Sequence, residues 1–151
     1  MKLSIRYLTI LLLALWGIQS EATCTTQFKS NLRGMPSTGS SIIRSLPMFS
    51  PLKIVERQED WIKVKGHKTE GWIYHTLIDE GLDCMTVKET SAPFCLSKHD
   101  QKTRPIVYSE GFKVLKKEIG CNLVMDKYGK KLWLSNTNIW PESESMKIII
   151  N

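Results

Sequence analysis

The stretch Trp72-Ile-Tyr-His-Thr-Leu-Ile78 decides the fold because it occurs a second time, as Trp133-Leu-Ser-Asn-Thr-Asn-Ile139. The correspondence extends upstream, so that the region from Asn31 to Ile78 is echoed by the region from Phe94 to Ile139. Self-similarity of this kind predicts two copies of one small structural unit.

The residues upstream of the two stretches correspond in type and in spacing. Leu52-Lys-Ile-Val55 leads, nine residues after Leu52, to Trp61. Phe112-Lys-Val-Leu115 leads, nine residues after Phe112, to Cys121. The apolar periodicity of these segments is two-fold rather than helical, which predicts an all-β fold.

Short strands separated by turns, most of which contain glycine, are typical of small barrels. The predicted strands are Ser40–Leu46, Pro51–Arg57, Asp60–Lys65, Glu70–Tyr74, Pro105–Tyr108, Gly111–Lys117, Cys121–Met125 and Lys131–Leu134. No sustained helical pattern is found after the first 22 residues.

The dipeptide Gly66-His67 predicts a two-residue hairpin loop, because glycine suits the first position of a type II′ turn. Counting outward from this loop places Trp61 opposite Trp72. The two indoles would then form a flat, partly exposed platform, with Ile62 and Val64 on the core face. The alternative is that both rings only cap the barrel.

The second copy differs at the same hairpin. It has one more residue in the loop, and Gly129 is predicted to take the left-handed position of a bulged turn. Cys121 stands where the first copy has Trp61, and is expected near Trp133. The second copy would therefore lack half of the platform, and the two units are not expected to be functionally equivalent.

Residues 1–22 have the pattern of an export signal. Lys2 and Arg6 precede Leu8–Ile18, an apolar run of eleven residues that is short for a membrane span. Ser20-Glu-Ala22 supplies small residues for cleavage after Ala22. Cleavage would lower the formal net charge from +6 to +5, because two cations and one anion are lost. The alternative is an uncleaved anchor.

The chain has four cysteines, Cys24, Cys84, Cys95 and Cys121. An even number in an exported chain predicts two disulfides. Cys95 and His99 are four residues apart, but a catalytic dyad or a zinc site needs further partners at suitable spacing. No phosphate-binding glycine loop or serine nucleophile motif is present either, so neither an enzyme nor a cofactor or metal protein is predicted.

Three motifs together resemble the bacterial SH3-like family. Asn31-Leu-Arg-Gly-Met-Pro-Ser37 is similar to its opening motif, Asp60-Trp-Ile-Lys-Val64 to its central strand, and Glu70-Gly-Trp-Ile73 to the strand after it. The resemblance implies small, five- to six-stranded, partly open barrels that bind cell-wall peptides or envelope proteins without catalysis. The fold class is thus two tandem SH3-like barrels after a signal helix.

The second copy departs from the family pattern. Phe94-Cys-Leu-Ser97 replaces the opening motif, Cys121 replaces the first tryptophan, and Leu132 replaces the glycine before Trp133. Ile139-Trp-Pro141 still resembles the end of exported tandem proteins of this kind. The predicted organisation is a signal peptide (1–22), a first domain (23–81), a divergent second domain (82–141) and a tail (142–151).

Alignment of the copies favours one of the three possible disulfide pairings. It places Cys95 on the opening strand and Cys121 on the central strand of one unit, which favours a bridge between them. Cys24 then pairs with Cys84 and ties the front of the first unit to the connector.

The sequence therefore predicts an exported, periplasmic or extracellular binding module with no cofactor, no nucleic-acid partner and no stable membrane span after cleavage. Its partner would be cell-wall peptide, peptidoglycan or an envelope protein. Arg33, Trp61, Trp72 and Tyr74 are the candidate ligand-binding residues, since aromatic and arginine side chains concentrate binding energy at contact sites. The alternative is an assembly partner of another envelope protein, with no wall ligand.

Overall fold

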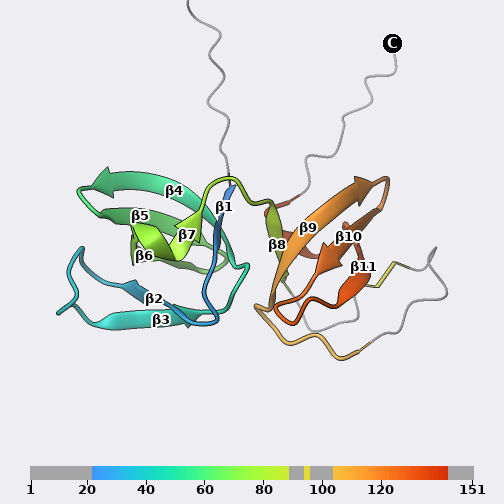
Figure 1. The fold of residues 1–151 in the computed structure, drawn as a ribbon, viewed down its shortest axis with the longest axis horizontal. Coiled ribbons are helices and arrows are strands. Elements are labelled where there is room, and N and C mark those ends of the chain that lie inside the picture. The colour runs from blue at the N-terminus through green and yellow to red at the C-terminus, as the bar shows by residue number, and fades with distance from the viewer. Residues whose placement is uncertain (1–21, 89–93, 96–103, 143–151) are drawn as a thin grey trace, which may run out of the picture.

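A computed structural model describes residues 22–88, 94–95 and 104–142. They form two sheets of antiparallel strands that lie next to each other (Figure 1), which confirms the all-β class and the arrangement as two tandem small β domains. The predicted signal segment, except Ala22, and nearly all of the predicted tail lie outside the described residues. No helix in the described ranges is long and apolar enough to cross a membrane.

The first sheet, called the first unit below, has the spatial order β3-β2-β6-β5-β4-β1-β7. A short 3₁₀ helix, η1 (His75–Leu77), connects β6 to β7 along the chain. The strands are β1 (Ala22–Thr25), β2 (Ser30–Arg33), β3 (Ile42–Leu46), β4 (Pro51–Gln58), β5 (Trp61–Gly66), β6 (Thr69–Tyr74) and β7 (Ile78–Asp79).

The second sheet, called the second unit, has the order β11-β10-β9-β8-β12. This order corresponds strand by strand to β6-β5-β4-β1-β7 of the first unit. The strands are β8 (Cys84–Val87), β9 (Gly111–Glu118), β10 (Cys121–Met125), β11 (Lys131–Ser135) and β12 (Ile139–Trp140). The domain limits predicted from the sequence stay a prediction, although the last strand of the first sheet and the first of the second lie on either side of residue 82.

One predicted strand is wrong. Pro105–Tyr108 is irregular and leads into a turn. Its backbone is held by side chains rather than by a neighbouring strand: Arg104 donates to the carbonyl of Pro105, and the amide of Val107 donates to the carboxylate of Glu110. An apolar run with β-branched residues therefore forms a loop here because its polar backbone groups are satisfied locally.

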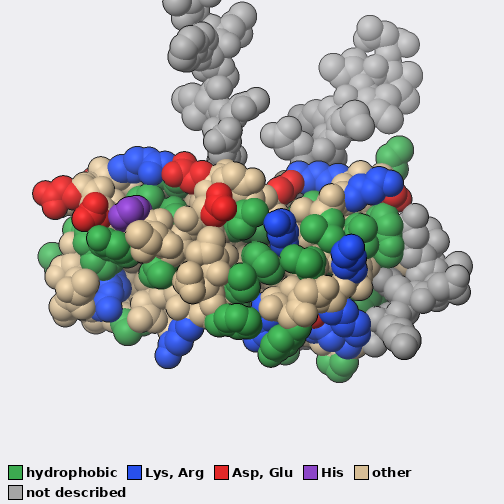
Figure 2. Space-filling model, in the orientation of Figure 1, with side chains coloured by type: hydrophobic (Ala, Val, Ile, Leu, Met, Phe, Trp, Pro, Cys, Tyr) green, Lys and Arg blue, Asp and Glu red, His purple; other side chains and the backbone are tan. Residues whose placement is uncertain are grey.

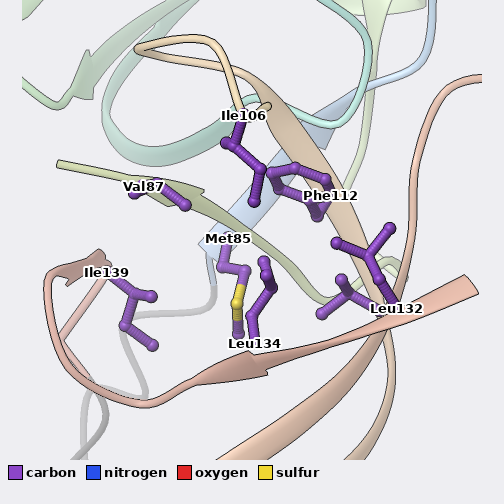
Figure 3. Packing of buried hydrophobic residues seen from close by; sticks show 8 residues of the cluster. Met85, Val87, Ile106, Phe112, Leu132, Leu134 and Ile139 are labelled. Carbon is purple, nitrogen blue, oxygen red and sulfur yellow. The ribbon is translucent and has the colours of Figure 1, made fainter. Parts of the chain in front are cut away.

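Each unit has its own apolar core. In the first, six buried residues pack together: Leu32, Leu46, Leu52, Ile62, Val64 and Ile73. In the second, eight do: Met85, Val87, Ile106, Phe112, Val124, Leu132, Leu134 and Ile139 (Figure 3). Alternate residues of β5 enter the core, which is the two-fold pattern of a sheet with one buried face.

A third cluster joins the units. The disulfide Cys24–Cys84 connects β1 to β8, and Phe49 packs against it. Gly111 lies so close to the first unit that a Cβ there would overlap the backbone of Met48 and Phe49. The second unit is thus fixed to the first by a covalent bond and by close backbone packing.

The predicted register of the β5–β6 hairpin is wrong. Gly66 pairs with Thr69, so the two loop residues are His67 and Lys68 rather than Gly66 and His67. Trp61 lies opposite Tyr74, not opposite Trp72. Moving the loop by one residue displaces every cross-strand partner by two positions.

The physical reason is that Gly66 serves packing rather than the turn. A Cβ at Gly66 would lie 3.2 Å from Cδ2 of Leu52 and 3.1 Å from Cγ2 of Thr69. The left-handed position of the turn is taken by Lys68, at φ 54°. The glycine that marked the loop in the sequence is therefore the last residue of β5.

Candidate functional site

The candidate site is the outer face of β2, β6 and β5, opposite the core of the first unit. Cross-strand pairing places Trp61 beside Tyr74, and Lys63 beside Trp72. On the other side of β6, Arg33 of β2 is paired with Trp72. The four predicted ligand-binding residues therefore lie on three adjacent strands of one face.

The exposed part of this face is an aromatic pair. The rings of Trp61 and Tyr74 meet edge to face with centroids 5.4 Å apart, and both side chains are half-buried. His75 stands against Tyr74, with ring centroids 4.9 Å apart. Edge-to-face contact of this kind is a favourable arrangement of two aromatic quadrupoles.

A carboxylate lies at the end of the aromatic pair. The hydroxyl of Tyr74 donates to Oδ2 of Asp60 at 3.2 Å, and Nε2 of His75 lies 3.8 Å from Oδ1. The negative charge of Asp60, followed by burial and by that hydrogen bond, raises the pKa of Tyr74 above its ordinary value. The phenol therefore stays protonated and keeps its donor over the physiological range.

Trp72 has a different role from the one expected of it. Its side chain is only 9% exposed. A Cβ at the preceding Gly71 would lie 2.7 Å from the carbonyl oxygen of Arg33, so β2 approaches β6 closely beside this indole. The predicted platform of two indoles is therefore wrong, and Trp72 forms the floor beside an exposed pair made by Trp61 and Tyr74.

Positive charge borders the aromatic pair. The guanidinium of Arg33 donates to the carbonyl of Ser40 at 2.6 Å, and has no acidic partner in the part of the chain that the structure describes. Lys63 lies opposite Trp72 in the β5–β6 pair, and its Nζ is 3.5 Å from Oε1 of Glu70. The face thus combines half-exposed rings, a guanidinium with donors to spare, and the carboxylates of Asp60 and Glu70.

Three residues of this face were not among the candidates from the sequence, namely Asp60, Lys63 and His75. The correct hairpin register would have identified Asp60 and Lys63. Asp60 directly precedes Trp61, and Lys63 lies opposite Trp72.

The corresponding hairpin of the second unit lacks this surface. Cys121 pairs with Ser135, and Trp133 pairs with Leu123, so Cys121 and Trp133 are not direct cross-strand partners. They are nevertheless close, because Cys95 is disulfide-bonded to Cys121 and its amide donates to the carbonyl of Trp133 at 3.3 Å. Gly129 has φ 82°, which confirms its left-handed position in the turn. At the positions of Trp61 and Tyr74 this hairpin has Cys121 and Ser135.

The cysteines form two disulfides, Cys24–Cys84 and Cys95–Cys121, the pairing that the alignment of the copies favoured. In the second unit the half-cystine of Cys121 stands at the position of Trp61. Within the described residues, no group of three or more His, Cys, Asp or Glu side chains is arranged to hold a metal ion. His99, considered with Cys95 as a dyad, lies outside those residues.

Comparison with protein families gives a match to the first unit. Residues 29–79 match the model of the bacterial SH3 domain. This match confirms the resemblance to the bacterial SH3-like family for the segment that carries the candidate site. No curated protein matches the chain.

Three solved structures are similar over most of the chain, at low identity. They are NlpC1 from Trichomonas vaginalis (11% identity, 80% of this chain, 45% of that one, TM-score 0.37) and NlpC2 from the same organism (11%, 87%, 50%, 0.34). The third is an NlpC/P60 endopeptidase from Photobacterium damselae subsp. piscicida (14%, 77%, 31%, 0.34). The chain spans half or less of each of them, and with TM-scores below 0.5 these likenesses do not bear on its activity.

Proposed function

We propose that this chain is an exported, non-catalytic module that binds cell-wall peptide or peptidoglycan through the outer face of the first unit. The observation that carries the proposal is the half-exposed pair of Trp61 and Tyr74, bordered by Arg33 and Lys63. The bacterial SH3 match over residues 29–79 supports a binding role for this unit. The two disulfides support an oxidising compartment outside the cytoplasm.

The chemistry of the face suits a wall fragment. Aromatic rings offer large, rigid apolar area for the C–H surfaces of sugars and for aliphatic side chains. The spare donors of Arg33 and the ammonium of Lys63 suit the carboxylates of an acidic peptide. The carboxylate of Asp60, at the other end of the pair, is placed to accept a hydrogen bond from an amine or a hydroxyl.

The test is co-sedimentation of the disulfide-bonded protein with purified peptidoglycan sacculi at physiological salt. Trp61→Ala should weaken binding about tenfold or more. An aromatic residue at the centre of a contact commonly contributes at least about 1.4 kcal/mol to the binding free energy, which corresponds to a factor of about ten. The matched control is Phe28→Ala, since Phe28 is an exposed aromatic residue (64%) of the same unit outside this face. Equal binding by the two variants would contradict the proposed site.

Absence of sedimentation by the unmodified protein would favour the alternative, an assembly partner with no wall ligand. One observation supports that alternative. Strand β3 is at the edge of the first sheet, and its Ile42 and Ile43 are about half exposed (51% and 54%). An edge strand with exposed apolar side chains is a ready surface for another protein.

A further inference from the structure

A cavity of about 440 Å³ lies where the two units meet, away from the face described above. Its walls come from the β3–β4 connection and the β5–β6 loop of the first unit, and from residues 104–110 and the β10–β11 loop of the second. Figure 2 shows apolar side chains gathered along this junction on the face in view, with Lys and Arg side chains beside them. Small-molecule sites in proteins have volumes of about 300–1,000 Å³ and are frequent at domain interfaces.

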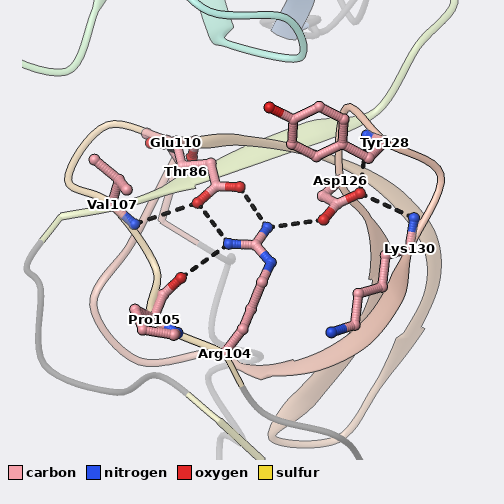
Figure 4. Close-up of polar contacts among 8 residues, drawn as sticks. All are labelled: Thr86, Arg104, Pro105, Val107, Glu110, Asp126, Tyr128 and Lys130. Atoms are coloured by element: carbon pink, nitrogen blue, oxygen red, sulfur yellow. Dashed lines mark hydrogen bonds and ion pairs between the residues drawn. The ribbon is translucent and has the colours of Figure 1, made fainter.

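The wall from the second unit is held rigidly. Arg104 is paired with both Glu110 and Asp126, and its second amino group donates to Glu110 at 3.0 Å (Figure 4). Asp126 is almost fully buried and also accepts from the amides of Tyr128 and Lys130, at 2.9 Å each. The network fixes the irregular segment that replaces the predicted strand. It also neutralises Arg104, which is therefore unsuited to attract an anion.

A second guanidinium in the wall is not neutralised. Arg44 of β3 donates to the hydroxyl of Ser109 across the junction at 3.2 Å, and it has no carboxylate partner among the residues that the structure describes. Lys127 adds a further ammonium group, placed over the ring of Tyr128 at 5.0 Å. The cavity thus has an excess of positive charge from one planar donor fork and one lysine.

His67 adds a neutral polar group to the same wall. Its Nε2 is buried and has no hydrogen-bond partner in the described part of the chain. Burial, followed by the charges of Lys68, Lys88 and Arg44, lowers the pKa of this imidazole, so it is neutral at pH 7. The imidazole therefore adds an uncharged ring to the wall, while Nε2 itself is not open to the cavity.

The remaining walls are largely apolar. They include Leu46, Pro47, Val107 and the ring of Tyr108, which meets His67 with centroids 6.4 Å apart. A small inorganic anion would leave these walls uncovered. A ligand with several negative charges would meet the carboxylate of Glu110 in the same cavity.

We propose that the cavity between the two units binds a small organic monocarboxylate with an apolar body, of the kind presented by the C-terminal residue of a peptide. The carboxylate pairs with Arg44, while the apolar body lies against Pro47, Val107 and Tyr108. The planar fork of an arginine matches the two oxygens of a carboxylate. This second site is independent of the wall-binding face.

The test uses N-acetyl-phenylalanine as the carboxylate probe and its primary amide as the neutral probe of the same shape. Both are titrated into the full disulfide-bonded protein, with amide chemical shifts recorded by NMR. The carboxylate should shift resonances of the β5–β6 loop and of residues 104–110. The amide should bind at least about tenfold more weakly, as expected for loss of a charge-assisted hydrogen bond.

Three variants define the site. Arg44→Gln should weaken binding of the carboxylate about tenfold, and Arg44→Lys should lose less because it keeps the charge. The control is Arg57→Gln, because Arg57 is an exposed arginine of the first unit paired with Glu80 at 2.6 Å and lies outside the cavity. Chemical shifts away from the substitution report whether each variant is folded.

Equal affinity for the acid and the amide, an unchanged affinity in Arg44→Gln, or no shifts around the cavity would each overturn the proposal. Trp61→Ala should leave the affinity for the probe unchanged. Failure of the wall-binding proposal and failure of this one are therefore separate results.

Discussion

The two units share a strand order but use one position in opposite ways. In the first unit, Trp61 at the start of β5 lies opposite Tyr74 and forms a half-exposed aromatic pair. In the second, Cys121 at the start of β10 lies opposite Ser135 and is closed by a disulfide to Cys95. The same place in the sheet thus holds a half-exposed aromatic ring in one unit and a covalent cross-link in the other.

The difference shows how each small unit divides its residues between stability and recognition. Domains of about 60 residues bury only roughly 60% of their surface and are marginal on their own. The second unit adds a disulfide of its own and a buried ionic network around Asp126 to its core. The first unit keeps exposed rings and an unneutralised arginine. We infer that the second unit stabilises the pair of units while the first carries the contact surface.

The largest expected effect is the loss of unfolding free energy when either disulfide is removed. Replacing both Cys24 and Cys84 by Ser should cost about 4 kcal/mol of unfolding free energy, because the bridge closes a 60-residue separation. Replacing Cys95 and Cys121, 26 residues apart, should cost about 3.5 kcal/mol. Urea unfolding followed by NMR signals of each unit measures both.

The informative result is which of the two units loses stability when a disulfide is removed. Loss of the Cys95–Cys121 bridge should lower the stability of the second unit, with the signals of β5 and β6 changing less. If both units unfold in one transition with the same loss, the division of roles between them is wrong. The reduced unmodified protein is the control for the substitutions themselves.

The next largest expected effect is a loss of stability of the second unit at low pH. Burial alone would raise the pKa of Asp126, but the hydrogen bonds from the amide of Lys130, the guanidinium of Arg104 and the amide of Tyr128 outweigh it and lower that pKa. A depressed carboxyl pKa contributes stability that is present above the unfolded-state value of about 4 and is lost as pH falls through the folded-state value. The second unit should therefore lose stability below about pH 4.

Asp126→Asn supplies the control. It should destabilise the second unit by about 2 kcal/mol at neutral pH, because charge-assisted hydrogen bonds to Asp126 are lost while Arg104 keeps Glu110. Its stability should then change less between neutral pH and pH 3 than that of the unmodified protein. An unchanged acid dependence in the variant would show that another group is responsible.

The sequence was sufficient for the features that depend on local pattern and on the comparison of the two copies. The long strands β4, β5, β6, β9, β10 and β11 were predicted within a few residues, since each has a clear two-fold period. The disulfide pairing followed from aligning the copies. By contrast β1, β2, β7, β8 and β12, with two to four residues each, were not predicted, because such strands are defined by partners distant in the sequence.

For the candidate site, residue types were easier to predict than their neighbours. Arg33, Trp61, Trp72 and Tyr74 do lie on one face, but which rings touch depended on the position of a single loop. Gly66 had two physical reasons to be glycine, a turn and close packing, and the sequence does not distinguish them. The cavity between the units was beyond prediction, since it depends on how two separately predicted sheets pack together.

The smallest expected effect is a change in the pKa of Tyr74, which tests the Trp61–Tyr74 pair. The charge of Asp60, then burial and the hydrogen bond donated by Tyr74, raise the pKa of that phenol. Asp60→Asn should return the titration of Tyr74 toward the ordinary value of about 10. NMR of ring-labelled tyrosine measures this titration.

The result bears directly on the comparison of the hairpins. The shift requires the corrected register, in which the hydroxyl of Tyr74 reaches the residue that precedes Trp61. In the register first predicted from Gly66, Trp72 would occupy that place and Tyr74 would lie beyond the end of the hairpin. An unchanged Tyr74 titration in Asp60→Asn would therefore count against the Trp61–Tyr74 pair, and with it against the surface that distinguishes the first unit from the second.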